Sequence, residues 1–496
     1  MDNRSNIVWF VADQMRADSM AHLGNPAAST PNLDAMAEEG VSFADAYCQN
    51  PVCVPSRCSF LTGLYPHTLG HRTMHFMMHR EDPNILKTMK EAGYEVVWIG
   101  RNDFIPGSWS KEAYCDHFFD GTDLVDKVGV AGLKMNFGGK NFPTPEVPEV
   151  FEGHDLKYSF FQGKYPEGSL NSDFDWNCVN AALAFLDSID PEKQEKPFFI
   201  YCTLSFPHPP YGCEEPWYSL VDRTALPPRR PNVETLEGKA SILSAIRDRQ
   251  DMKRWGEPQY DEMRAVYLGM VARWDHMLGL VLDKLRERGL YDDTNVFAFS
   301  DHGDLTGDYG IAEKCQNSFE DPLTNVPLVV KPAASVPVEP GVRHGLVGLI
   351  DLPATVAEIV GVDLGYVQFG SSLMGAISGE DTPHDAMFCE GGRIHGEWQA
   401  MEPEHGPESP YWPRISAQHE EGPAHTKGAM VRMGNLKYVM RLYEGDQLYD
   451  LEVDPMELVN LVDDPAYAQS AAQLRDRLLR FYMETADYVP PKFDKR

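Results

Sequence analysis

Four short apolar runs, each leading into polar residues, constrain the fold of this chain more than any other feature. Each run is continuously apolar rather than alternating, which is the pattern of a strand covered on both faces of a sheet. Helical patterns lie between the runs, and the clearest of them ends at Gly289. The runs are residues 7–12, 96–99, 198–204 and 296–299, and the helical face consists of Met263, Tyr267, Met270, Trp274, Met277, Val281 and Leu285. Strands that alternate with helices predict an α/β domain.

The polar residues that follow these runs predict a single active site. In α/β sheets, ligands bind beyond the carboxyl ends of the strands. Three runs end beside the candidate residues Asp13, Arg101 and Asp301, and the fourth leads within a few residues to His208. We therefore expect one site assembled from segments that lie far apart in the sequence.

The length of the chain favours two domains, because 496 residues exceed what one hydrophobic core usually organises. Beyond about residue 365 the sequence changes to loops rich in Gly and Pro with short strand patterns. We predict a catalytic domain over residues 1–365 and a smaller C-terminal α+β domain over residues 366–496. The elements predicted for the second domain are antiparallel strands at 429–433, 436–440 and 447–451, and a helix over 468–484.

The charge of the chain limits its partners. Its 75 acidic and 44 basic residues give a formal net charge of −31, which repels nucleic acid and anionic lipid headgroups at long range. We therefore expect no nucleic-acid partner and no membrane partner. An anionic substrate would need local basic residues to overcome this field, so a cluster of Arg, Lys and His near acidic residues is informative.

The cysteines and the apolar segments bear on the location of the protein. The nine cysteines are odd in number, scattered and without a Cys-x-x-Cys pair, which argues against a disulfide framework or a structural zinc site. No uninterrupted apolar stretch of about 18 residues occurs, so we expect neither a signal peptide nor a membrane span. These features favour a cytoplasmic location; a periplasmic or secreted location would require a leader that was removed.

The most specific motif is Cys53-Val54-Pro55-Ser56-Arg57, followed by Leu61-Thr62-Gly63. It resembles the signature of the type I sulfatases, in which a dedicated maturation enzyme converts the cysteine to formylglycine. The resemblance implies a hydrated aldehyde with two hydroxyls on one carbon, one to attack sulfur and one to expel the sulfate afterwards. Arg57 would hold this hydrate and offset its developing negative charge.

Further segments match sulfatase landmarks in the expected order over nearly the whole chain. The resemblance implies the fold of the alkaline phosphatase superfamily, which is a large mixed sheet sandwiched by helices with a smaller C-terminal antiparallel-sheet domain. The matching segments include Trp274-Asp275, Leu349-Ile350-Asp351-Leu352-Pro353 and Leu448-Tyr449-Asp450-Leu451. Two stretches without a match, roughly 104–175 and 392–426, are expected to shape the substrate pocket.

The resemblance also implies one divalent metal ion. Its expected ligands are Asp13, Gln14, Asp301, His302 and the modified Cys53. Carboxylate and amide oxygens suit Ca²⁺, which is the ion that we expect. Many sulfatases have a second Asp at the position of Gln14, and imidazole suits transition metals, so Mn²⁺ and Zn²⁺ are the alternatives.

Two further catalytic residues match the sulfatase pattern. His208 lies in the segment Pro207-His208-Pro209-Pro210, and a histidine there can protonate a departing alkoxide because its unperturbed pKa lies near neutrality. Lys314 matches the sulfate-binding lysine of the family.

The chain departs from the family pattern after the run at 96–99. Many sulfatases have Gly-Lys-x-His there, whereas this chain has Gly100-Arg101-Asn102-Asp103. Arg101 can replace the lysine as a catalytic cation, but Asp103 cannot donate a hydrogen bond as a histidine would. We therefore predict that nearby His71, Arg72 and His75, together with Asp103, bind the substrate.

These motifs predict a sulfuric ester hydrolase that acts on a sulfated carbohydrate or an aryl sulfate. The first alternative is a phosphonate monoester or phosphodiester hydrolase with the same nucleophile, because such relatives carry the same Asp-Gln and Asp-His pairing. The second is a catalytically silent protein that binds sulfate esters. Its expected sign is the loss of Cys53, of a metal carboxylate or of His208, and all of these are present.

Overall fold

An eight-stranded sheet forms the centre of the molecule. The computed structural model describes residues 4–121, 144–168, 173–420 and 422–491. In sheet order the strands are β11 (Gly341–Arg343), β2 (Val41–Phe43), β10 (Leu328–Lys331), β9 (Thr294–Ser300), β1 (Asn6–Asp13), β7 (Phe198–Pro207), β4 (Glu95–Gly100) and β5 (His117–Phe119). Strands β9, β1, β7, β4 and β5 are parallel, and β10 pairs antiparallel with β9. The large mixed sheet and its four predicted strands are confirmed.

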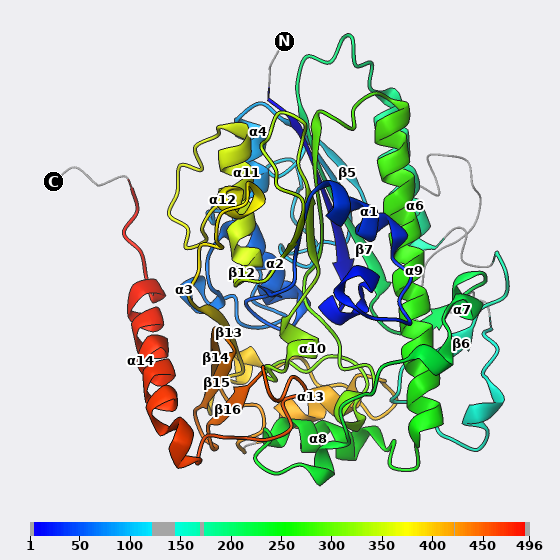
Figure 1. Cartoon of the computed structure of the whole chain (residues 1–496), viewed down its shortest axis with the longest axis vertical. Coiled ribbons are helices and arrows are strands. Elements are labelled where there is room, and N and C mark those ends of the chain that lie inside the picture. Colours follow the sequence, from blue (N-terminus) through cyan, green and yellow to red (C-terminus); the bar gives the residue numbers. More distant parts are fainter. Residues whose placement is uncertain (1–3, 122–143, 169–172, 421, 492–496) are drawn as a thin grey trace.

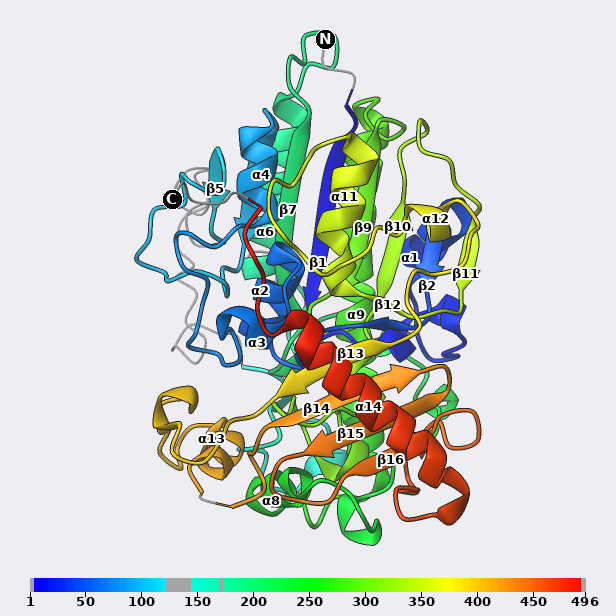
Figure 2. The ribbon, with the colours of Figure 1, turned by 90° about the vertical axis from the view of Figure 1, so that its left-hand side faces the viewer.

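Helices cover both faces of this sheet, as Figures 1 and 2 show. One face carries α1 (Pro31–Glu39), α6 (Phe174–Ser188) and α9 (Glu257–Glu287); the other carries α2 (Cys53–Thr62), α4 (Ile85–Glu91) and α11 (Leu352–Val360). All eight residues of β1 are buried. A strand covered on both sides needs apolar residues at successive positions, which explains the continuous runs.

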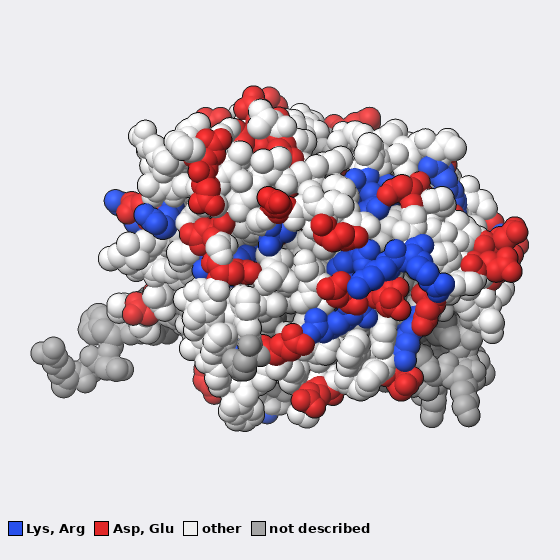
Figure 3. All heavy atoms as spheres, turned by 90° about the horizontal axis from the view of Figure 1, so that it is seen from below, with Lys and Arg blue, Asp and Glu red and all other residues white. Residues whose placement is uncertain are grey.

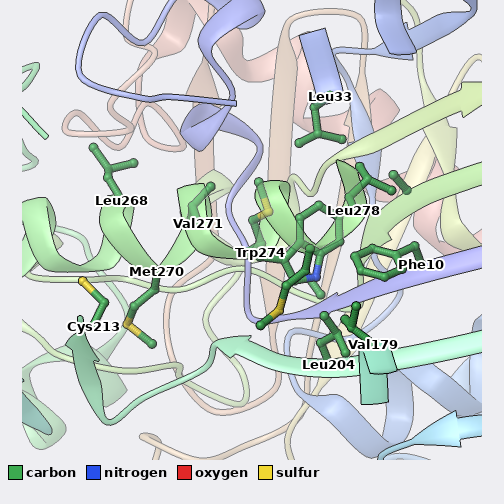
Figure 4. Packing of buried hydrophobic residues seen from close by; sticks show 14 of the residues in the cluster. Phe10, Leu33, Val179, Leu204, Cys213, Leu268, Met270, Val271, Trp274 and Leu278 are labelled. Carbon is green, nitrogen blue, oxygen red and sulfur yellow. The ribbon is translucent and has the colours of Figure 1, made fainter. Parts of the chain in front are cut away.

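The longest helix, α9, packs its apolar stripe against the sheet. The ring centroid of Trp274 lies 5.0 Å from that of Phe10 on β1, within the cluster drawn in Figure 4. Two residues after the end of α9, Gly289 adopts a φ of 68°. This left-handed conformation favours glycine and ends the helix where the sequence predicted.

Asp275, next to Trp274, fastens α1 to α9. Its carboxylate accepts hydrogen bonds from the backbone N–H groups of Asn32 (3.1 Å) and Leu33 (2.8 Å), and from the side-chain amide of Asn32 (2.8 Å). The two backbone groups belong to the first turn of α1, where N–H groups have no partner within the helix. The Trp274-Asp275 landmark therefore has a structural role.

A four-stranded antiparallel sheet lies beyond the carboxyl end of the large sheet. Its strands are β13 (Met387–Gly391), β14 (Gly428–Met433), β15 (Leu436–Arg441) and β16 (Gln447–Asp450). Helix α14 (Ala468–Thr485) lies across one face of this sheet (Figure 2) and buries Leu474, Leu478 and Phe481. The three predicted strands and the predicted helix are confirmed, whereas β13 was not predicted. The domain boundary at residue 365 stays a prediction.

Buried ion pairs join the small sheet to the rest of the molecule. Lys437 on β15 is fully buried, and its Nζ lies 2.6 Å from Asp321 and 2.7 Å from Glu457. Asp321 begins α10 (Asp321–Thr324), which precedes β10 of the large sheet. Lys437, Asp321 and Glu457 thus form a charged core between the two sheets.

Shorter elements complete the fold. They are β3 (Ala46–Tyr47) paired with β12 (Val347–Gly348), β6 (Phe161–Lys164) paired with β8 (Tyr211–Cys213), and the helices α3 (Pro66–Leu69), α7 (Trp217–Leu220), α8 (Ser241–Gln250), α12 (Met374–Ile377) and α13 (Trp412–Gln418). Among the helices of the described ranges, none is both long and apolar enough to cross a membrane.

Basic and acidic side chains are mixed on the face seen from below in Figure 3. Basic residues gather on one side of this face, and acidic residues border them.

Candidate active site

The carboxyl ends of four parallel strands bring predicted site residues together. Asp13 ends β1, Arg101 follows β4, His208 follows β7, and Asp301 and His302 follow β9. All are buried except Arg101, whose side chain is 22% exposed. Segments that lie far apart in the sequence therefore converge at one edge of the sheet, and their role as one active site stays a prediction.

Cys53, the first residue of α2, lies where these segments meet. Its Sγ is 3.1 Å from His302 Nε2, 3.4 Å from Lys314 Nζ and 3.6 Å from Asp13 Oδ1. Burial, and then the charge of Asp13, raise the pKa of the thiol well above its usual value.

Each carboxylate of Asp13 and Asp301 has one oxygen bound to Arg57 and the other in a candidate metal site. This site, called the cage below, consists of Asp13, Cys53, Asp301 and His302. Arg57 takes the outer oxygens, with Nη2 3.0 Å from Asp13 Oδ2 and Nε 2.9 Å from Asp301 Oδ2. The Oδ1 atoms of both carboxylates lie 3.7 Å from His302 Nε2. With Cys53, these ligand atoms all lie within 4.8 Å of one another.

His302 is oriented as a metal ligand. Its Nδ1 lies 2.9 Å from the carbonyl oxygen of Gly303, which requires an N–H donor. Burial lowers the pKa of His302, so the ring is neutral and its Nε2 lone pair faces the cage. Two carboxylates and one imidazole of this kind fit a divalent cation.

Gln14 lies at the edge of the cage in an uncommon backbone conformation. Its φ is 74°, a value that non-glycine residues adopt rarely and mainly at functional sites. Its backbone N–H donates to Asp301 (3.1 Å), its side-chain oxygen accepts from Lys314 (2.8 Å), and its side-chain nitrogen donates to Asp304 (2.6 Å). A second lone pair of the amide oxygen remains for the predicted ligand role.

Cations keep Asp13 ionised. Burial by itself raises the pKa of this carboxyl, but the charges of Arg101, Arg57 and Lys314 together hold it well below its usual value. Arg101 makes the shortest contact, with Nη1 2.6 Å from Asp13 Oδ2. Asp13 is therefore a charged ligand at neutral pH.

His208 forms a pair with Lys314. Its Nδ1 lies 2.6 Å from the carbonyl oxygen of Pro209, and its Nε2 lies 2.9 Å from Lys314 Nζ. Burial, followed by the charge of Lys314, lowers the pKa of His208 well below its usual value. The neutral ring therefore accepts the hydrogen bond, and the proton between the two residues belongs to the lysine.

The four predicted substrate-binding residues lie in different surroundings. Asp103 borders the site, with Oδ2 3.5 Å from Arg101 Nε. His71 pairs with Asp82 (3.0 Å), Arg72 pairs with Glu397 (2.8 Å), and His75 is exposed. Their role in binding substrate stays a prediction.

Sequence reasoning gave no role to Asp304, Tyr211 or Asp175. Tyr211 donates to Asp304 (2.9 Å), and this buried pair holds the side chain of Gln14. Asp175 on α6 accepts from the backbone N–H groups of Ser205 (2.6 Å) and Phe206 (2.9 Å), at the end of β7 just before His208. Asp304 was visible in the motif at 300–304, but the other two have no local signal because their partners lie 93 and 30 residues away.

Both stretches in which no sulfatase landmark was recognised, 104–175 and 392–426, contribute residues beside the site. Tyr411 lies near Lys314 and Arg101, whose charges act on its pKa against the larger effect of burial, which raises it. Its ring centroid lies 5.0 Å from that of Phe160 in the other stretch. Residues 122–143, 169–172 and 421 of these stretches lie outside the described residues.

Comparison with known proteins agrees with this geometry. The sulfatase family model matches residues 5–362. The multifunctional alkaline phosphatase superfamily protein PehA of Trinickia caryophylli is 26% identical, over 98% of this chain and 96% of its own length. The arylsulfatase of Clostridium perfringens is 25% identical, over 96% of this chain and 94% of its own. The crystal structure of a phosphonate monoester hydrolase of Agrobacterium radiobacter has the same fold, with a TM-score of 0.77, 22% identity and coverage of 97% of this chain and 96% of that one. The chain therefore belongs to the sulfatase family of hydrolases, within the alkaline phosphatase superfamily.

Proposed function

We propose that the protein hydrolyses a sulfate ester, either of a carbohydrate or of an aryl alcohol, with formylglycine at position 53 as its nucleophile. The observation that carries this proposal is the position of Cys53 Sγ among His302, Lys314 and Asp13. The sulfur stands where a hydroxyl oxygen of the aldehyde hydrate would lie. Oxidation of this cysteine to the aldehyde would place the nucleophile at that point.

The residues around position 53 divide the work of the reaction. Hydrated formylglycine supplies one hydroxyl to attack sulfur and a second to expel the sulfate. Arg57 keeps the outer oxygens of Asp13 and Asp301 in place, which orients their inner oxygens toward position 53. Lys314 and Arg101 are placed to offset the negative charge of the transferring group.

A divalent ion would be held by Asp13, Gln14, Asp301 and His302. When bound, it supplies charge stabilisation of the transferring group and orientation of the nucleophile. Ca²⁺ is the ion proposed from the oxygen ligands, with Mn²⁺ or Zn²⁺ favoured if His302 coordinates directly.

The leaving-group oxygen is assigned to the pair of His208 and Lys314. The 2.9 Å contact between their nitrogens places one proton between them, on the lysine in this structure. A leaving alkoxide needs a proton, and the ammonium of Lys314, which donates to His208, is a donor beside Cys53.

A second candidate activity is hydrolysis of a phosphonate monoester or phosphodiester by the same nucleophile. The presence of Gln14 and His302 in the cage favours it, since both residues fit the pairing expected for such hydrolases. Sulfate and phosphonate monoesters are both tetrahedral monoanions, so one cage can serve either.

Two measurements test the proposal. Mass spectrometry of the peptide around residue 53, from protein made with and without a formylglycine-generating enzyme, should show replacement of the thiol by an aldehyde only in the first sample. Steady-state rates on 4-nitrophenyl sulfate and on the matching phenylphosphonate monoester should then show a higher kcat/KM for the sulfate. A higher value for the phosphonate would establish the second activity instead, and an active enzyme with an unmodified thiol would rule out the nucleophile.

A further inference from the structure

Glu313 links Lys314 to an arginine of the C-terminal part. Glu313 Oε1 lies 3.4 Å from Lys314 Nζ, and its Oε2 lies 3.3 Å from Nε of Arg414 on α13. The three residues are 1%, 2% and 6% exposed, respectively. At these lengths the contacts are ion pairs rather than close hydrogen bonds, and burial strengthens the attraction because water screens it less.

The backbone at Glu313 is fixed independently of Lys314. Its φ is 69°, in the left-handed region that a non-glycine residue keeps only where its surroundings determine it. Its N–H donates to the hydroxyl of Tyr211 (2.9 Å), and Tyr211 donates in turn to Asp304 (2.9 Å). Glu313 therefore presents its carboxylate from a rigid position.

Arg414 is held from its own side. It donates to Glu402, which also accepts from the side chains of Gln418 (2.8 Å) and Gln316. The backbone N–H of Glu402 donates to Gln418 (3.0 Å). These partners lie within residues 392–426, except Gln316, which lies two residues after Lys314. They hold the side chain of Arg414 independently of its contact with Glu313.

Lys314 depends on such a fixed neighbour. A lysine ends in a point charge on a long flexible stem, and its direction is set by what surrounds it. Its Nζ donates to Gln14 (2.8 Å) and lies 2.9 Å from His208 and 3.4 Å from Cys53. Among the described residues, Glu313 is the carboxylate paired with it.

We propose that Glu313 and Arg414 are positioning residues that set where the ammonium of Lys314 points. Through them, a segment without a counterpart among the sulfatase landmarks takes part in the reaction. This inference rests on the proposed function, in which Lys314 offsets charge on the transferring sulfate.

Kinetics of Glu313→Gln, Arg414→Gln and the double variant test the inference. Lys314 acts on charge that grows in the transition state, so a misdirected ammonium lowers kcat more than it changes KM. We expect a loss of kcat on the order of 10- to 100-fold for each single variant. The double variant should lose no more than the more damaged single variant, because both act through one lysine. Arg414→Lys keeps the charge and should restore part of the rate.

A control variant separates positioning from general damage to this segment. Glu408→Gln removes the exposed pair of Glu408 with Lys157, which lies 3.1 Å away and also ties residues 392–426 to the first unmatched stretch. It should keep the parent kcat. Unchanged kcat in folded Glu313→Gln protein, or losses that multiply in the double variant, would overturn the inference.

A crystal structure of Glu313→Gln with Cys53 unmodified gives a readout that needs no turnover. We expect Nζ of Lys314 to leave hydrogen-bond distance of Gln14 or His208. If Nζ keeps both contacts, Glu313 does not position it. If the parent enzyme hydrolyses neither ester, the proposed function fails, and this structure still decides the positioning role.

Discussion

Truncation of Cys53 tests the proposed chemistry at a single side chain. Cys53→Ala removes the group that becomes the nucleophile but changes the buried volume little, so we expect no turnover from a protein with the parent thermal unfolding curve. Cys53→Ser has one hydroxyl instead of two and should at most trap a sulfated enzyme, seen as a gain in mass after incubation with substrate. More than a few per cent of parent activity in the alanine variant would contradict the mechanism.

Asp301→Asn tests the cage. The substitution removes one charged candidate metal ligand and one of the two carboxylates that pair with Arg57. We therefore expect activity to fall by several orders of magnitude. Dialysis of the parent enzyme against a chelator should have the same effect, and adding back Ca²⁺, Mn²⁺ or Zn²⁺ should identify the ion by the rate that returns. An unchanged rate after chelation, with no divalent ion found by elemental analysis, would refute the metal assignment.

His208→Ala tests the assignment of the leaving group. A sugar alkoxide needs a proton as it departs, whereas a nitrophenolate largely does not. The variant should therefore slow hydrolysis of a sugar sulfate far more than that of 4-nitrophenyl sulfate. Equal losses on the two substrates would leave His208 as a residue that only positions the sulfate.

At the scale of elements, the cap that Asp275 provides for α1 should contribute measurably to the free energy of unfolding. Asp275→Ala leaves the two N–H groups of the first turn without an acceptor, and we expect a loss of about 1–2 kcal/mol in the free energy of unfolding. Asp283→Ala is the matched control, because Asp283 lies on the same helix with its side chain 76% exposed. Denaturant unfolding of the two variants should separate them, and equal stabilities would show that the cap contributes nothing.

The same cap should make stability depend on pH. Burial raises the pKa of Asp275 to about 6. This pKa lies above that of an aspartate in the unfolded chain. The contribution of Asp275 to the free energy of unfolding is therefore complete below about pH 4 and is lost as the pH rises through about 6. The difference in stability between the parent and Asp275→Ala should therefore be larger at about pH 4 than at about pH 7.

The elements differ in how far the sequence predicted them. Strands β1, β4, β7 and β9 were predictable because both of their faces are buried, which requires unbroken apolar runs. Strands β2, β11 and β13 have three to five residues and leave too short a pattern to separate from a loop.

The site shows a similar division. The proximity of residues in local motifs at strand ends, such as Asp13 and Asp301, was predictable from the sequence. The roles of Tyr211, Glu313 and Arg414 were not, because each depends on a partner that the fold brings from about 100 residues away, as the 102 residues between Tyr211 and Glu313 illustrate.

At the scale of the whole molecule, the charged core around Lys437 should make the two sheets unfold together. Lys437→Met removes the ammonium that pairs with the buried Glu457 and the half-buried Asp321, and we expect a loss of up to about 3–5 kcal/mol in the free energy of unfolding. Calorimetry should show one transition for the parent and one, at lower temperature, for the variant.

Arg480→Met is the control for this prediction. Arg480 on α14 pairs with Asp476 at 2.9 Å, and both side chains are more than half exposed, so its loss should change stability little. Two separate transitions in the parent protein, with the C-terminal part melting alone, would contradict the shared core.

The burial of Cys53 also sets an order of events during biosynthesis. All ten residues of α2 are buried in the folded chain, so an enzyme that recognises the segment around Cys53 cannot reach it once folding is complete. If residue 53 is converted to formylglycine as proposed, the conversion must then take place on the newly made, still extended polypeptide. A cell that synthesises the protein faster than it can oxidise this cysteine would accumulate well-folded molecules that stay inactive for their whole lifetime.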